Sequence, residues 1–346
     1  MSDPAKILII RLSSLGDIVH ALPAFQSLRR SFPEARLDWL VERRLAFFLE
    51  AVPGIDRIVP IDTHALRRQI ARPEAWRLLV RPLREVRAVR YDLAIDFQGL
   101  IKTALLCRLS AARVRVGFSR ELVRERPAHW GYQRTLGRPE APAHIVRLNL
   151  LLAGVAGATA PGLPIALKAA DADGAAVDDR LRRAKTSAFV VLNPGGGWPN
   201  KRWPPERYGA LADLIRTRLG LEVVVTTGPG EESLYVGIAG ACPKIPPLHM
   251  PVPFMQLIPL FQRARLVVGG DTGPVHLACA LGIPVVAILG PTSPARNGPW
   301  SAADEVVVRC LPCSFCHRRA CPTATECMDI PVEEVFAGVA KRLGAT

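Results

Sequence analysis

Short apolar runs rich in β-branched residues alternate with amphipathic segments along most of this chain of 346 residues. Several runs are apolar at nearly every position, as in Lys6–Leu12 and Leu266–Gly270, which is typical of strands covered on both faces. Segments with helical spacing, such as Pro205–Leu219, fall between them. This order predicts βαβ units with parallel sheets, so the fold class is α/β.

The predicted strands form two sets of five. In the first half of the chain they are Lys6–Leu12, Arg36–Val41, Arg57–Ile61, Asp92–Phe97 and Arg113–Phe118. In the second half they are Ala188–Asn193, Leu221–Thr227, Leu266–Gly270, Pro284–Leu289 and Glu305–Arg309. The clearest helical segments are Leu22–Phe32, Ala143–Ala153, Pro205–Leu219 and Gly273–Leu281.

The alternation fades over Gly154–Ala188. This stretch opens with many Ala, Gly and Pro residues and is predicted to be a linker. We therefore expect two Rossmann-like domains, over residues 1–165 and 166–330. In such domains, ligands bind beyond the carboxyl ends of the strands. Two facing domains would share one central cleft.

The positive charge is concentrated in the first half of the chain. Residues 1–170 contain 27 Lys and Arg against 15 Asp and Glu, whereas residues 171–346 contain 18 against 16. Such an excess predicts an anionic partner, either a phosphorylated glycolipid, a membrane surface or nucleic acid. The alternative is a solvated arginine-rich surface. An aromatic content of 6% argues against rows of rings that stack on bases.

The sequence offers no candidate for a secretory signal or a membrane span. Arg11 interrupts the apolar run Ile7–Ile10, and Gly282 and Pro284 interrupt Leu277–Gly290. We expect a cytoplasmic protein that is at most peripheral on the cytoplasmic face of the inner membrane. The eight cysteines would then remain mostly thiols.

The first polar constellation, Ser13–His20, follows the first strand and opens the first helix. Ser and Asp are common helix-capping residues, so capping is one interpretation of Asp17. The other is a general base, because the position faces the expected cleft and a carboxylate can accept the proton of a sugar hydroxyl. The helix dipole would lower its pKa and leave it ionised but weakly basic.

A second constellation, Asn193–Trp203, contains three consecutive glycines that let backbone N–H groups approach an anion. Lys201 and Arg202 can then neutralise a diphosphate. The loop is no Walker A motif, because its glycines are contiguous and no Gly-Lys-Ser/Thr follows. An ordinary strand-to-helix loop is the alternative.

A third constellation, Gly269–His276, places two glycines and Asp271 between a strand and a helix. The start of that helix is a ready anion site. Alternatively, Asp271 and Thr272 only cap the helix and His276 only faces the core. Leu289–Pro294 forms a second loop of this kind, and two such loops favour a cradle for a nucleoside diphosphate.

Arginines recur through the segment between the third and fourth predicted strands. Arg77, Arg81 and Arg84 share one helical face. They predict either a solvated basic helix or a surface that captures acidic groups of an acceptor or a membrane. The run comprises Arg67, Arg68, Arg72, Arg77, Arg81, Arg84, Arg87 and Arg90.

Five cysteines lie within residues 310–327, with His317 among them. Their spacing can suit zinc or an iron–sulfur cluster. A second Cys-x-x-Cys pair of the usual kind is missing, however, and the set is not a clean four. A thiol-rich structural loop is favoured over a structural metal at Cys310–Cys327.

Taken together, these motifs resemble those of the heptosyltransferases of lipopolysaccharide core synthesis, glycosyltransferase family nine. The matching stretches are KILIIRLSSLGDIVHALPA, DFQGLIKTALL, GGGWPNKRW, GGDTGPVHLACALGIPVVAILGPTSP and the cysteine-containing segment. The resemblance implies a GT-B type fold whose C-terminal helix, here residues 331–346, returns to the first domain. It also implies ADP-heptose as donor and an inverting transfer that needs no metal cofactor.

The resemblance also assigns roles to individual residues. Asp17 matches the catalytic base, and Lys201 matches a lysine on the leaving diphosphate. The predicted donor-binding residues are Gly195, Gly196, Lys201, Arg202, Glu232 (with Glu231 as a near alternative), Asp271, Thr272, Gly273 and His276. The predicted acceptor-binding residues are Ser14, Gly16, Arg67, Arg68, Gln98, Arg124, His144 and Arg147.

The leading interpretation is therefore transfer of heptose from ADP-heptose to an anionic lipopolysaccharide inner-core acceptor. Transfer of another sugar to another acceptor, or epimerisation of a nucleotide sugar, is the rival among enzymes. An epimerase needs no acceptor, so donor alone would distinguish it. A nucleic-acid-binding protein is the rival outside enzymes, suggested by the pI of about 10.0. No nucleic-acid motif supports it, so no nucleic-acid partner is expected.

Overall fold

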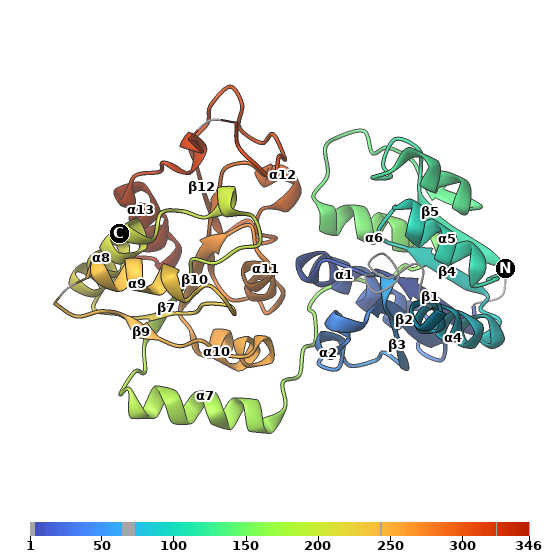
Figure 1. The fold of residues 1–346 in the computed structure, drawn as a ribbon, viewed down its shortest axis with the longest axis horizontal. Coiled ribbons are helices and arrows are strands. Elements are labelled where there is room, and N and C mark those ends of the chain that lie inside the picture. The colour runs from blue at the N-terminus through green and yellow to red at the C-terminus, as the bar shows by residue number, and fades with distance from the viewer. Residues whose placement is uncertain (1–3, 64–72, 243, 323, 346) are drawn as a thin grey trace. The chain divides into compact units, whose positions relative to one another are not determined.

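The computed structural model describes residues 4–63, 73–242, 244–322 and 324–345, with the backbone alone for 73–78. These residues form two compact units, Met1–Leu167 and Lys168–Thr346 (Figure 1). The division falls two residues beyond the expected boundary. No helix among the described residues is long and apolar enough to cross a membrane.

The first unit is built on a parallel sheet of six strands in the order β3-β2-β1-β4-β5-β6. The strands are β1 (Lys6–Ile10), β2 (Arg36–Glu42), β3 (Arg57–Ile61), β4 (Leu93–Asp96), β5 (Val114–Phe118) and β6 (Arg134–Leu136). The helical elements are α1 (Leu15–Ser31), η1 (Arg43–Leu45), α2 (Ala46–Leu49), α4 (Pro73–Val89), α5 (Ile101–Leu109), η2 (Arg126–Gly131) and α6 (Ile145–Val155).

Alternation along β1 divides the core of this unit into two layers. Leu8 and Ile10 pack in one cluster with side chains of α4 and α5. Successive side chains of a strand point to opposite faces, so Ile7 and Ile9 face the other layer. Helices α1 and α6 pack against each other. The sheet is thus covered as an almost continuously apolar strand requires.

The second unit repeats this architecture with strand order β12-β11-β10-β7-β8-β9. Its strands are β7 (Phe189–Asn193), β8 (Glu222–Val225), β9 (Leu248–His249), β10 (Leu266–Gly270), β11 (Val285–Leu289) and β12 (Glu305–Val308). Its helical elements are α7 (Asp171–Arg183), η3 (Pro199–Lys201), α8 (Pro205–Leu219), α9 (Glu232–Gly240), η4 (Phe254–Gln256), α10 (Leu257–Arg263), α11 (Gly273–Ala280), α12 (Pro294–Asn297), η5 (Glu326–Met328) and α13 (Val332–Leu343). The predicted α/β class with parallel sheets is confirmed.

All ten predicted strands are present, with ends that shift by one or two residues. The two strands that the pattern missed, β6 and β9, are short edge strands of their sheets. The linker prediction was wrong for part of its length, because α7 occupies Asp171–Arg183. Val177 and Leu181 of α7 are buried, and four residues apart they form one narrow apolar stripe on an otherwise polar helix.

The C-terminal helix α13 contributes to the core of the second unit. Val335 and Val339 of α13 are buried in the core of the second unit, alongside residues of α8 and β11. Lys341 pairs with Glu305 at 2.9 Å, and Arg342 pairs with Asp304 at 2.8 Å. The apolar face of α13 therefore packs within the second unit, whereas the expected return of residues 331–346 to the first domain stays a prediction.

Candidate active site

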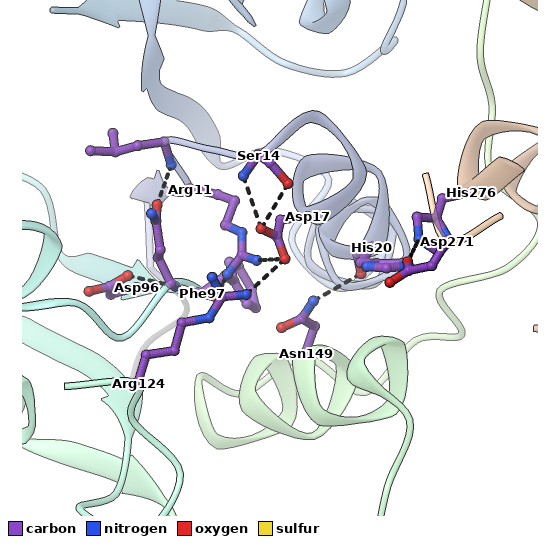
Figure 2. A network of polar contacts seen from close by, with 12 residues as sticks. Arg11, Ser14, Asp17, His20, Asp96, Phe97, Arg124, Asn149, Asp271 and His276 are labelled. Carbon is purple, nitrogen blue, oxygen red and sulfur yellow. Dashed lines mark hydrogen bonds and ion pairs between the residues drawn. The ribbon is translucent and has the colours of Figure 1, made fainter. Parts of the chain in front are cut away.

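Asp17 lies in the first turn of α1, directly after the central strand β1. The turn between them places Ser14 as the residue that caps the helix. The backbone N–H of Ser14 donates to Oδ2 of Asp17 at 2.9 Å, and the Ser14 hydroxyl donates to the same oxygen at 3.0 Å (Figure 2). Asp17 is thus the acidic partner of a capping box, as the capping interpretation anticipated.

The other carboxylate oxygen of Asp17 is held by two arginines. Arg11 Nη2 lies 2.6 Å and Arg124 Nη2 lies 3.0 Å from Oδ1 (Figure 2). Arg11 is buried and also donates to the carbonyl of Phe97. Burial alone would raise the pKa of Asp17, but the charges of Arg11 and Arg124 outweigh it and hold that pKa well below its usual range.

The two arginines differ in how firmly they are held. The Arg11 side chain is 1% exposed, whereas that of Arg124 is 43% exposed. Arg124 is therefore the partner of Asp17 that is accessible from outside, whereas Arg11 is enclosed. Loss of the Arg124 charge would raise the pKa of Asp17 and make it a stronger base.

The loop after β4 completes this end of the first sheet. Gln98 is buried, and its Oε1 accepts from the backbone N–H of Leu12 at 2.8 Å. Asp96 Oδ1 accepts from the backbone N–H of Gln98 at 2.8 Å, and burial raises the pKa of Asp96. The structure thus brings Gln98 beside the Asp17 cluster, where its side chain ties β1 to the loop.

The remaining predicted acceptor residues lie on α1, on α6 or outside the described residues. Gly16 is buried in the first turn of α1. His144 caps α6, accepts from the backbone N–H of Val146 at 3.2 Å, and meets the ring of His20 edge-on at 5.9 Å. Arg147 is exposed on α6. Arg67 and Arg68 lie outside the described residues.

In the second unit, the loop after β7 and the loop after β10 meet around Asp271. Lys201 Nζ lies 2.6 Å from Oδ2 of Asp271. His276 Nε2 lies 2.7 Å from Oδ1 of the same carboxylate (Figure 2). Burial opposes ionisation of Asp271, yet the hydrogen bond from His276 and the charge of Lys201 hold its pKa below the usual range. Asp271 therefore fixes the lysine that was predicted to hold the leaving diphosphate.

Close packing accounts for two glycines of these loops, Gly196 and Gly270. A Cβ on Gly270 would lie 2.9 Å from the carbonyl oxygen of Lys201. A Cβ on Gly196 would lie 3.1 Å from Cγ2 of Thr272, the residue that caps α11. Helix α11 begins at Gly273, and the N–H groups of a first helical turn have no acceptor within the helix. The glycine loop thus lies beside a helix start.

Glu231, rather than Glu232, contacts the glycine loop. Its Oε1 accepts from the N–H of Gly196 at 2.9 Å, and its Oε2 accepts from the N–H of Gly228 at 2.9 Å. Glu232 is exposed at the start of α9. Arg202 donates to the carbonyl of Gly196 at 2.7 Å and pairs with Glu231 at 3.4 Å, so it braces this loop.

Two residues near Lys201, namely Trp198 and Arg319, were not singled out from the sequence. Lys201 Nζ lies 4.1 Å from the ring centre of Trp198, and the guanidinium of Arg319 lies 5.4 Å from it. Arg319, Asn200 and Arg202 line a pocket of about 640 Å³. Arg319 is more than a hundred residues from the glycine loop in sequence, so no local pattern could assign it there.

The cysteine-rich segment packs beside the donor loops. The N–H of Phe315 donates to Gly290, and that of His317 donates to Pro291, so this segment rests on the loop after β11. Seven cysteines are free thiols, namely Cys107, Cys242, Cys279, Cys310, Cys313, Cys316 and Cys327. No three His, Cys, Asp or Glu side chains among the described residues are placed to share a metal ion. Burial raises the pKa of the Cys327 thiol, which packs in the core.

The structure describes only part of the arginine run, on α4. Arg81 and Arg84 are both exposed, and Arg81 pairs with Glu85 at 3.2 Å. Arg77 lies on the same helix, and Arg72 lies outside the described residues. The common helical face of Arg81 and Arg84 supports a basic surface but leaves open what it contacts.

Comparison with known proteins places this architecture in a family. The chain is 29% identical to lipopolysaccharide heptosyltransferase 1 of Pseudomonas aeruginosa over 91% of this chain and 87% of that protein. It is 28% identical to lipopolysaccharide heptosyltransferase 1 of Escherichia coli K12, with 87% and 92% covered. The solved structure of E. coli heptosyltransferase WaaC with ADP superposes with a TM-score of 0.77 at 23% identity, covering 97% of this chain and 99% of that one.

The last comparison is with family profiles rather than single proteins. The profile of glycosyltransferase family 9 (heptosyltransferase) matches residues 79–326, which is more than half of the chain. The match includes the glycine loop, the Asp271 loop and most of the cysteine segment. The chain therefore belongs to glycosyltransferase family 9, the heptosyltransferases, and is a glycosyltransferase, as its motifs indicated.

Proposed function

We propose that this chain transfers heptose from ADP-heptose to an anionic inner-core acceptor of lipopolysaccharide, either Kdo–lipid A or a core that already carries heptose. The family supports the heptosyl group. The names of the relatives support a lipopolysaccharide acceptor, and the titles of the solved structures with ADP and ADP-2-deoxy-2-fluoro heptose support the donor.

The observation that carries the proposal is that Lys201 and the start of α11 lie beside the glycine loop. Lys201 is oriented by Asp271, and the start of α11 lies next to Gly196. Together they offer a positive charge and backbone donors to a diphosphate. Such a group stabilises the charge that develops on a departing nucleoside diphosphate.

The reaction proposed is a single displacement with inversion. A lone pair of the acceptor hydroxyl forms the new bond to the anomeric carbon, and the bond from that carbon to the diphosphate oxygen breaks. Asp17 takes the hydroxyl proton, and ADP leaves with the bonding electron pair. A weakly basic Asp17 suits this path, because the hydroxyl proton becomes acidic only as the new bond forms. Lys201 and the start of α11 neutralise the leaving group, so no step is assigned to a metal.

The acceptor is proposed to meet the first unit at Asp17. Arg124 holds Asp17 in this structure but is largely accessible. A carboxylate or phosphate on the acceptor would compete with Asp17 for that guanidinium. Acceptor binding would thereby raise the basicity of Asp17 at the moment the base is needed.

A membrane-embedded acceptor also implies where the enzyme works. We propose peripheral contact with the cytoplasmic face of the inner membrane. The net positive charge of residues 1–170 supports attraction to an anionic surface.

Mass spectrometry of reaction products tests the proposal. The purified chain is incubated with ADP-heptose or UDP-sugars, each with and without Kdo–lipid A and its heptosylated form. We expect a gain of one heptose on an acceptor, with ADP-heptose only. Conversion of the donor in the absence of acceptor would instead identify an epimerase. Transfer from a UDP-sugar alone would identify a different donor.

A further inference from the structure

Helix α5 has an apolar face that the first unit does not bury. Ile101, Leu105 and Leu109 are 49%, 54% and 39% exposed, and their spacing of four residues puts them on one side of the helix. The other side is already in the core, where Leu106 and Cys107 pack below β4 and β1. A helix that is apolar on both sides is expected to have something covering the outer one.

Trp130 extends this face beyond the helix. Its side chain is 72% exposed in η2, which packs against α5. Gly131 permits that packing, since a Cβ there would lie 2.8 Å from the Cβ of Ala104. Arg108 of α5 donates to the carbonyl of Trp130 at 3.4 Å. We call the four side chains Ile101, Leu105, Leu109 and Trp130 the α5 strip.

The strip stands out from the rest of the described surface. Ten large apolar side chains are exposed among the described residues, and four of them are in the α5 strip. Isolated exposed apolar residues need no explanation, whereas a contiguous group marks an interaction site. An amphipathic tryptophan at the edge of such a group is typical of membrane interfaces.

The segment of the chain that contains the strip is rich in positive charge. Residues 79–138 contain 13 Lys and Arg against 5 Asp and Glu. Arg108 lies on α5 between Leu105 and Leu109. Arg84 and Arg87 are exposed on α4, which covers the same face of the sheet as α5 (Figure 1). Exposed apolar side chains beside exposed arginines match a bilayer that has acyl chains below anionic headgroups.

We propose that the α5 strip is a membrane-docking surface, which inserts its apolar side chains at the interface of an anionic bilayer while the flanking arginines contact lipid phosphates. A second copy of this chain is a poorer fit. A twofold contact through the strip would place Arg108 and its neighbours opposite their own copies, and like charges repel. The purpose of the docking, delivery of the enzyme to a lipid-linked acceptor, rests on the proposed function, but the binding itself does not.

Vesicle sedimentation tests the surface directly. The probes are vesicles of phosphatidylcholine mixed with phosphatidylglycerol, and vesicles of phosphatidylcholine alone. We expect the wild type to bind the mixed vesicles and to bind the neutral ones far more weakly. The double variant Leu105→Gln, Trp130→Gln should lose about tenfold or more in affinity for the mixed vesicles. The matched control is Val236→Gln, Ile245→Gln, which removes similarly exposed apolar side chains from the second unit and should bind like the wild type.

Two activity assays separate this inference from the proposed function. With a deacylated, water-soluble acceptor, the double variant should be as active as the wild type, whereas with acceptor embedded in vesicles its rate should fall. If the wild type uses neither acceptor, the proposed function fails while the sedimentation result still decides the docking surface. Equal binding of wild type and double variant to the mixed vesicles would overturn the inference. The inference would also be overturned if the double variant kept the vesicle affinity of the wild type but changed its oligomeric state in gel filtration. The strip would then be an interface between two copies of this chain.

Discussion

Asp17 and Asp271 are two buried carboxylates in comparable places, one at the carboxyl end of β1 and one at that of β10. Both have lowered pKa values because cations compensate them. The cations differ in kind. Asp17 is held by Arg11 and Arg124, which stay charged, whereas Asp271 is held by Lys201 and His276.

In the sequence, Asp17 and Asp271 look alike, because each is an aspartate that follows a strand. The difference in their partners suggests different roles for the two residues. Asp271 is 6% exposed and orients Lys201, which fits the proposed role of that lysine in holding the donor diphosphate. Asp17 is 17% exposed, and one of its partners is accessible, so its own basicity can change when a ligand arrives. The surroundings of each carboxylate, rather than its position, indicate what it does.

Replacing Asp17 by Asn should have the largest effect of any single change. We expect transfer to fall by about a hundredfold or more, because general-base catalysis is lost. Stability should fall as well, by about 2 kcal/mol, since Arg11 is left buried without its counter-charge. Turnover must therefore be measured well below the Tm of the variant.

A matched variant controls for that loss of stability. Asp38 is a buried carboxylate of the same unit, paired with Arg36 and with the hydroxyl of Tyr91. Asp38→Asn should lower the Tm and leave transfer nearly unchanged. If Asp17→Asn retained turnover within about tenfold of the wild type, Asp17 would not be the base.

Lys201→Ala probes the Asp271 side of the comparison. The Michaelis constant for donor should rise and kcat should fall, together by about tenfold or more, because a charged contact to the diphosphate is lost. The Michaelis constant for acceptor should stay the same. Lys341→Ala, which removes an exposed lysine of the same unit, is the control. A normal Michaelis constant for donor with a raised Michaelis constant for acceptor would show that Lys201 contacts the acceptor and not the donor.

Arg124→Gln sharpens the comparison by changing only the accessible partner of Asp17. The Arg124 charge lowers the pKa of Asp17, so its removal raises that pKa. The acid limb of the pH–rate profile should therefore move to higher pH, and the acceptor constant should rise about threefold to tenfold. Arg120→Gln, an exposed arginine of the same loop, should do neither. An acid limb that stays in place would mean that Arg124 does not control the base.

Ionic strength should change the Michaelis constants for acceptor and donor by different amounts, and these changes should be smaller than those caused by the substitutions. Exposed charges are screened over roughly 8–10 Å at physiological salt. The acceptor constant should rise with salt, because the basic surface of the first unit contributes to acceptor binding. The donor constant should respond less, because Lys201 and Asp271 are largely buried. Equal responses would favour a merely solvated basic surface.

Chelation should have the smallest effect, namely none. In the proposed mechanism, Lys201 and the start of α11 supply the positive charge to the leaving diphosphate, so transfer should continue in EDTA. Loss of turnover that Mg²⁺ or Mn²⁺ restores would refute a metal-free leaving-group step. Zinc or iron in elemental analysis would concern the cysteine segment at 310–327 instead.

Much of the fold and part of the site could be predicted because their signals are local. Apolar runs located ten of the twelve observed strands. Strand-end motifs singled out Asp17, Lys201 and Asp271, whose roles stay predictions. Edge strands β6 and β9 escaped because strands of two or three residues carry no periodicity. The helical face of α13 is visible in the sequence, but the unit that buries it is set by tertiary packing, as Val335 and Val339 show.

The partners of the site residues were the least predictable part. Arg11 follows β1 directly and resembles any residue that ends a strand, yet its burial makes it the firmest partner of Asp17. Glu231 and Glu232 are adjacent and chemically alike, and only the turn before α9 decides which one meets Gly196. Long-range pairs of this kind depend on the folded chain.

The anomeric configuration of the product tests the central claim most directly. If Asp17 deprotonates the acceptor for a single displacement while Lys201 holds the departing diphosphate, every turnover inverts the anomeric carbon. NMR of the purified product, compared with the donor, reports that configuration. The account predicts a heptoside of configuration opposite to that of the donor. A product that retains the donor configuration would contradict it, because retention requires a second displacement or front-side attack.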